Sequence, residues 1–214
     1  MLHSLCILTT LAAPAADDDM TKALRTVTGA DSYAFSVREA RGGEIEGKYQ
    51  KDRPLFFRAD RIDFLKKGDV LLYNRDDKWQ KSKTGIQSDP LIVLGASAKV
   101  RGARLPHEEL AVLQKHLRDV KKSDDKGQTM YRGDLAEEGA RGLAKTEDRD
   151  VTRGATAKLW VDDKGRLVRY EVTIRLKGRR GNVEVNGETT KTVTLKDVGA
   201  TKVDVPDEAK KLLE

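Results

Sequence analysis

Two hydrophobic periods alternate along this chain and predict its helices and strands. The first apolar series has the three- and four-residue spacing of one helical face, and it follows an acidic run at residues 17–19. Negative side chains favour the positive end of a helix dipole, so the run marks a helix start. The apolar positions of this first predicted helix are Met20, Ala23, Leu24 and Val27.

From residue 32 the period changes to two, which is typical of strands with one solvent-facing side. Tyr33, Phe35 and Val37 alternate with small or polar residues, and a turn at residues 41–43 leads into the next strand. The following segment, residues 47–74, reads GKYQKDRPLFFRADRIDFLKKGDVLLYN: a strand, an Arg-Pro break, an aromatic strand, a charged turn and a further apolar strand. Such a series predicts a curved antiparallel sheet whose apolar face is covered by helices or by a greasy ligand.

The middle of the chain has a mixed pattern. The apolar run at residues 91–96 is either a buried strand or a short helix that covers the sheet. A helix is predicted from residue 105 to Val120, followed by a polar loop at residues 122–127, a short strand at 129–132 and a short helix at 135–143. The apolar face of the longer helix consists of Leu110, Leu113, Leu117 and Val120.

The C-terminal third has the clearest strand pattern. Turn sequences at residues 162–165 and at Asn186-Gly187 predict two hairpins, and a short helix is expected after Pro206. The order of helix, strands, helices and strands predicts an α+β fold: one large, curved antiparallel sheet with helices on one side. The apolar face of the central strand consists of Val168, Tyr170, Val172, Ile174 and Leu176.

Charge excludes one class of partner. The 214 residues include 41 Lys and Arg against 35 Asp and Glu, a net charge of +6, and the two signs are interspersed. A nucleic-acid binder concentrates its cations on one face, so we expect no nucleic-acid partner. The length fits one domain, which we place at residues 17–214.

Residues 1–16 have the pattern of a secretory signal peptide. An apolar run at residues 5–13 precedes Ala13-Pro14-Ala15, although no Lys or Arg precedes the run. We therefore expect a periplasmic or otherwise exported protein. Cys6, the one cysteine of the chain, lies within this segment, so the processed protein would have no disulfide and no thiolate chemistry.

No catalytic pattern stands out in the sequence. His107 and His116 lie nine residues apart, unlike the four-residue zinc spacing, and are interpreted as solvated helix residues. No carboxylate lies within an apolar run where burial would raise its pKa. We therefore expect a protein that is not an enzyme and that needs no metal or other cofactor.

The segment that begins at Gly47 carries a family resemblance. Its Gly47…Arg53-Pro54…Phe57 spacing resembles the strand pair of the periplasmic lipoprotein carriers of the LolA type and of the related LppX-like lipid-binding proteins. The run at residues 89–94 is similar to the apolar lid helix of that family, and residues 205–209 resemble its closing segment.

The resemblance implies an open β-barrel with a helical lid over a cavity for the acyl chains of a lipid or lipoprotein. It implies that Arg53 hydrogen-bonds the lid backbone and that Phe57 lies at the cavity edge; a guanidinium has five fixed donors for such a role. The expected ligand-binding residues are Arg53, Phe57, Tyr33, Phe35, Tyr49, Leu72, Leu91 and Leu94.

A second function stays open at this point. The same fold also serves envelope regulators that sense lipoproteins and bind a membrane-anchored protein. The long helix with Leu110, Leu113 and Leu117, together with the dense surface charge, is consistent with such a non-catalytic scaffold.

Overall fold

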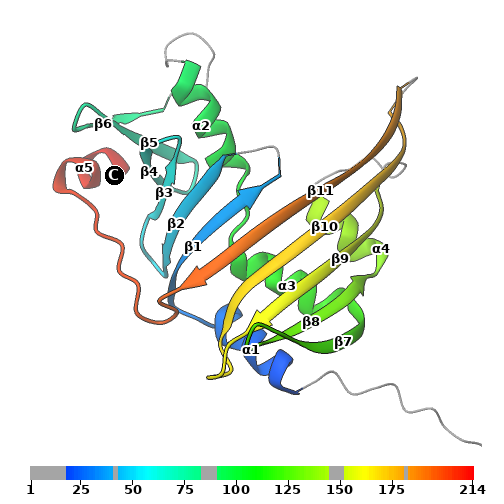
Figure 1. Cartoon of the computed structure of the whole chain (residues 1–214). Coiled ribbons are helices and arrows are strands. Elements are labelled where there is room, and N and C mark those ends of the chain that lie inside the picture. Colours follow the sequence, from blue (N-terminus) through cyan, green and yellow to red (C-terminus); the bar gives the residue numbers. More distant parts are fainter. Residues whose placement is uncertain (1–17, 41–42, 83–90, 145–151, 181–182) are drawn as a thin grey trace, which may run out of the picture.

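The computed structural model describes residues 18–40, 43–82, 91–144, 152–180 and 183–214 (Figure 1). The predicted signal peptide lies outside these residues. Within them, all strands belong to one antiparallel sheet in the order β6-β5-β4-β3-β2-β1-β11-β10-β9-β8-β7. The edge strands β6 and β7 are not paired with each other, so the sheet is curved but not closed into a barrel. The prediction of an open α+β sheet is confirmed.

The strands are short in the first half of the sheet and long in the second. Neighbours pair in antiparallel register throughout. Their bounds are β1 Ser32–Glu39, β2 Glu44–Gln50, β3 Leu55–Ala59, β4 Ile62–Lys67, β5 Val70–Arg75, β6 Lys78–Lys81, β7 Leu117–Asp125, β8 Gln128–Leu135, β9 Thr152–Val161, β10 Leu167–Arg180 and β11 Val183–Lys196.

Four helices share one core with the inner face of the sheet: α1 (Asp18–Thr28), α2 (Leu91–Gly102), α3 (Pro106–His116) and α4 (Glu137–Ala144). The run at residues 91–96 is therefore the covering helix and not a strand. A fifth helix, α5 (Asp207–Leu213), packs with the outer face of β4–β6 in a second, smaller core (Figure 1).

The second core explains the adjacent apolar residues in the middle of β4 and β5. Leu71 and Tyr73 point into the main core, whereas Leu72 between them packs beneath α5. In β4, Phe64 and Leu65 divide between the two cores in the same way. A strand that is buried on both faces has no polar alternation, so its period cannot be read from the sequence.

Three hairpins depend on two-residue turns in which both residues have positive φ. These turns are Asp60-Arg61, Asp76-Asp77 and Lys126-Gly127, with φ between 51° and 80°. Turns of this type match the right-handed twist of the flanking strands, and Asp tolerates the conformation better than most residues. The tight turns close the β3–β4, β5–β6 and β7–β8 hairpins.

The predicted helix over residues 105–120 is wrong in its last turn. The helix α3 ends at His116, and Leu117 begins strand β7, which includes most of the predicted polar loop at residues 122–127. The charged sequence of β7 does not show a strand pattern. The strand lies at the edge of the sheet, where charges prevent pairing with other chains.

The predicted turn at Asn186-Gly187 is also wrong. These residues lie within β11, where Asn186 pairs with Lys177 and Gly187 with Leu176. Strand β10 ends at Arg180 and β11 begins at Val183, and these two residues pair with each other. Cross-strand pairing along fourteen-residue strands outweighs the local preference of one dipeptide.

Candidate ligand pocket

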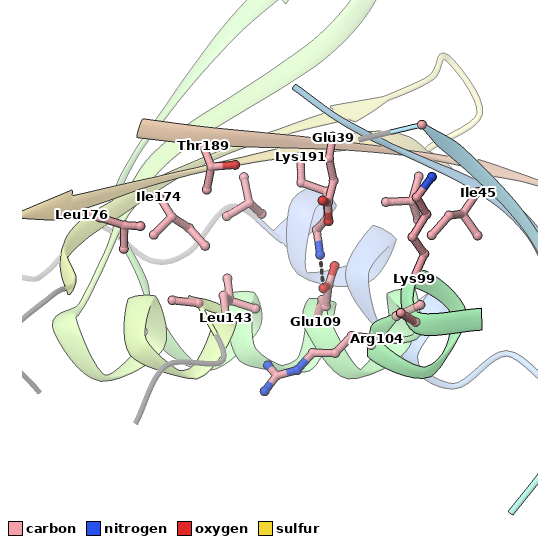
Figure 2. A pocket seen from close by; sticks show the side chains of 17 residues that line it. Glu39, Ile45, Lys99, Arg104, Glu109, Leu143, Ile174, Leu176, Thr189 and Lys191 are labelled. Atoms are coloured by element: carbon pink, nitrogen blue, oxygen red, sulfur yellow. Dashed lines mark hydrogen bonds and ion pairs between the residues drawn. The ribbon is translucent and has the colours of Figure 1, made fainter. Parts of the chain in front are cut away.

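A cavity of about 470 Å³ lies between the inner face of the sheet and the helical layer (Figure 2). Strands β1, β2, β10 and β11 form one wall, and α2, α3 and α4 form the other. Its volume is within the range of small-molecule sites. The apolar lining residues are Val37, Ile45, Ala98, Ala103, Leu143, Ala144, Val172, Ile174 and Leu176.

The strand register explains why these side chains face one cavity. On β10, Val172, Ile174 and Leu176 are spaced by two and lie on the face that the sequence predicted to be apolar. On β1 and β2, Val37 and Ile45 are direct cross-strand partners. The cavity therefore continues the inner surface of the curved sheet where the helices do not fill it.

An ion pair connects the two walls of the cavity. Lys191 of β11 donates to Oε1 of Glu109 on α3, and the Tyr170 hydroxyl donates to Oε2 of Glu109 at 2.8 Å. The Glu109 side chain is 2% exposed and that of Lys191 is 24% exposed. Complete burial, together with the neighbouring Glu109 carboxylate, raises the pKa of Tyr170, so the phenol stays protonated and remains a donor.

A second ion pair connects α2 to the β3–β4 turn beside the cavity. The Nζ atom of Lys99 lies 3.1 and 2.8 Å from the two carboxylate oxygens of Asp60. Lys99 lines the pocket, and Asp60 belongs to the β3–β4 turn. Both side chains are about one-third exposed (36% and 33%), so the pair orients the helix end more than it stabilises the fold.

Five aromatic rings form a separate cluster on the same face of the sheet. The Tyr33 ring stacks on Tyr49 at 5.0 Å, and Phe35 meets Phe57 edge-on at 6.1 Å. His107 of α3 completes the cluster, 4.8 Å from the Tyr49 ring. The four predicted ligand-binding residues of this cluster, Tyr33, Phe35, Tyr49 and Phe57, are brought together, but none of them lines the cavity.

The remaining predicted site residues lie in different places. Arg53 is exposed in the β2–β3 connection, and Leu72 is buried beneath α5 on the outer face. Leu91 and Leu94 belong to the first turns of α2, and their side chains lie outside the described part of the chain.

The two charged residues at the centre of the cavity were missed. Glu109 lies in no apolar run, but it is in helical phase with the buried Pro106, Leu110 and Leu113 and is buried with them. Lys191 likewise shares a strand face with the buried Val193 and Leu195. The sequence therefore shows that both residues share a face with buried apolar residues, but charged residues at such positions were expected to be exposed to solvent.

The interpretation of both histidines as solvated residues is also wrong. His107 packs in the aromatic cluster, and the side chain of His116 is only 12% exposed. Among the described residues, no group of three or more potential ligands is arranged to hold a metal ion. Likewise, none of the described helices has both the length and the apolar character required to cross a membrane.

Comparison with known proteins identifies the fold. No protein-family model matches the chain, and no curated protein sequence matches it. Among solved structures, the chain is similar to the lipoprotein LppX of Mycobacterium tuberculosis, with a TM-score of 0.53, 15% identity and coverage of 88% of this chain and 97% of LppX. It is also similar to LprF from Mycobacterium bovis, with a TM-score of 0.58, 11% identity and coverage of 90% and 96%. The chain has the LppX-like fold.

Proposed function

We propose that this protein is an exported, non-catalytic binding protein that holds an acyl chain of a lipid or lipoprotein in the cavity between its curved sheet and its helices. The observation that carries the proposal is the 470 Å³ cavity with nine apolar lining residues in a chain with the LppX-like fold. Each methylene group that leaves water for such a lining contributes about 0.8 kcal/mol. A short acyl chain therefore gains enough free energy for stable binding.

Export is part of the same proposal. The apolar run and the A-x-A pattern in residues 1–16 support it, and one of the structurally similar proteins, LppX, is itself described as a lipoprotein. A compartment between membranes is where a water-soluble holder of acyl chains is useful. Of the leucines that favoured the regulatory alternative, Leu110 and Leu113 are fully buried in the core and are not a docking surface.

Native mass spectrometry after detergent-free purification tests the proposal. The wild-type protein is expected to carry acyl species that leave on solvent extraction. Ala98 lines the cavity and is exposed, so Ala98→Trp should fill part of the cavity with a large ring and abolish the binding of acyl species. Ala111→Trp is the matched control, because Ala111 is an exposed helix residue that does not line the cavity. Equal loads in both variants, or a wild-type protein that never binds lipid, would refute the proposal.

A further inference from the structure

The Lys191–Glu109 pair divides the cavity into two parts (Figure 2). In sheet order β11 lies between β1 and β10, so Lys191 separates the wall formed by β1 and β2 from the wall formed by β10. Figure 2 shows Ile174, Leu176 and Leu143 on one side of the pair and Ile45 and Lys99 on the other. The pair thus connects the sheet to helix α3 between the two parts of the cavity.

The two parts differ in polarity. The part between β10 and α4 is lined by Leu143, Ala144 and the β10 side chains, without a charged residue beyond the pair itself. The part toward α2 also contains Lys99 and Arg104, and Glu39 of β1, the direct cross-strand partner of Lys191, lies beside the pair. The free-energy cost of burial is lowest for a hydrocarbon chain in the first part of the cavity. For a polar group, that cost is lowest at the ion pair, where it can form a hydrogen bond.

Within the pair, Lys191 is the group that can bind a ligand. Both oxygens of Glu109 already accept hydrogen bonds, from Tyr170 and from Lys191. An ammonium has three donors and no acceptor, and Glu109 is the one hydrogen-bond partner of Lys191 within the described residues. Lys191 therefore has donors left for an oxygen atom in the cavity.

Stability alone does not account for this arrangement. Removing two charges from water offsets most of their attraction, and well-packed apolar residues can replace a buried ion pair without loss. Glu109 and Lys191 lie among aliphatic side chains that would accommodate such residues.

We infer that the Lys191–Glu109 pair is the head-group site of the cavity. It takes a single-chain amphiphile whose head has a carbonyl-type oxygen acceptor, either a carboxylate or an ester. The chain extends between β10 and α4, and the head stops at Lys191. This inference rests on the proposed function, because it names the ligand class and the ligand orientation for the same cavity.

Three probes with matched chains test the inference: laurate, methyl laurate and dodecyltrimethylammonium, each used below its aggregation threshold to displace a fluorescent fatty-acid analogue. The first two have the acceptor and the third does not. A hydrogen bond to a charged donor contributes about 1.5–3 kcal/mol, so we expect the better of the first two to bind at least about tenfold tighter than the third. The better of the two identifies the source as carboxylate or ester.

Variants assign the preference to the pair. Lys191→Met alone would leave Glu109 charged and buried, so it is combined with Glu109→Gln, which keeps an acceptor for the Tyr170 hydroxyl. The double variant should lose the preference for acceptor heads, and Lys191→Arg should retain it. Lys196→Met, the same change at an exposed position of β11, is the matched control and should behave as wild type.

The possible outcomes are distinct. Equal affinity of the wild type for all three probes, or a preference that persists in the double variant, overturns the head-group site while acyl binding stands. If none of the probes binds and no lipid co-purifies, the proposed function fails, and the inference fails with it.

Discussion

The hydroxyl group of Tyr33 lies 2.6 Å from Nδ1 of His107, and this hydrogen bond joins strand β1 to helix α3. The backbone N–H of His107 also donates to the Tyr33 oxygen, at 3.4 Å. Burial raises the pKa of Tyr33 and lowers the pKa of His107. A protonated phenol and a neutral imidazole therefore share this hydrogen bond.

A double-mutant cycle should measure this connection. Tyr33→Phe and His107→Phe each remove one partner but keep an aromatic ring in the cluster. We expect a coupling energy of about 1 kcal/mol between the two positions in the free energy of unfolding, since a net hydrogen bond contributes that much. Urea unfolding monitored by circular dichroism gives all four values. Purely additive losses would mean that the bond does not contribute to stability.

Stability should decrease in mild acid because of His107. Burial lowers the pKa of this imidazole below its ordinary value of 6.5, although the neighbouring Glu108 raises it in part. The folded state then binds fewer protons than the unfolded state, so the free energy of unfolding rises with pH in this range. The contribution is complete above the unfolded pKa and is lost as the pH falls through it toward the lower folded pKa.

Urea titrations at neutral pH and at about pH 5 check this expectation. His107→Gln should show a smaller decrease than wild type between the two conditions. His116 remains in both proteins and so cancels from the comparison. If wild type and variant lose the same stability, the dependence comes from other groups.

Gly47 is required because the Phe35 ring lies across it. A Cβ atom at position 47 would lie 2.2 Å from Cζ of Phe35, and that ring is fixed between Tyr33 and Phe57. Gly47→Ala should therefore cost about 1–3 kcal/mol by overpacking. Adding Phe35→Leu removes the clash and should recover part of the lost melting temperature. Gly95→Ala, where a Cβ meets no atom within 4 Å, is the control.

A substitution at Arg53 should affect ligand release more than it affects stability. Its exposed position in the β2–β3 connection means that Arg53→Leu should change the free energy of unfolding by less than about 0.5 kcal/mol. From the family resemblance we expect the same variant to change the release rate of a bound acyl chain more than it changes folding. Stopped-flow transfer of a fluorescent fatty acid to vesicles measures the release rate. Unchanged release would remove the role that the resemblance implies.

The sequence predicted the architecture well where one face of an element is wet. Alternation at Tyr33, Phe35 and Val37 and the helical spacing of Met20 to Val27 predict β1 and α1 within a residue or two. The prediction failed at Leu117 and Val120, which continue a helical spacing although they belong to β7. A spacing of three or four residues cannot show that the helix ends at His116 and that the next residues form an edge strand.

A cavity under the helices was expected from the family resemblance, but its position was not predicted. The aromatic residues of β1–β3 were expected to line it, yet they fill the space beneath α3 with their own rings. The cavity lies further along the same strands, where Val37 and Ile45 are smaller and the C-terminal ends of α2 and α4 form the opposite wall. Which part of an apolar face is filled depends on where each helix docks.

Periodicity by itself determined that this chain forms helices over one side of an antiparallel sheet, because a local pattern of apolar side chains dictates which face of each element avoids water. Only the tertiary structure decided where an empty volume remains and that Lys191 meets Glu109 within it. These two residues are 82 positions apart, and their contact depends on the packing of α3 against β11. No local spacing encodes that distance.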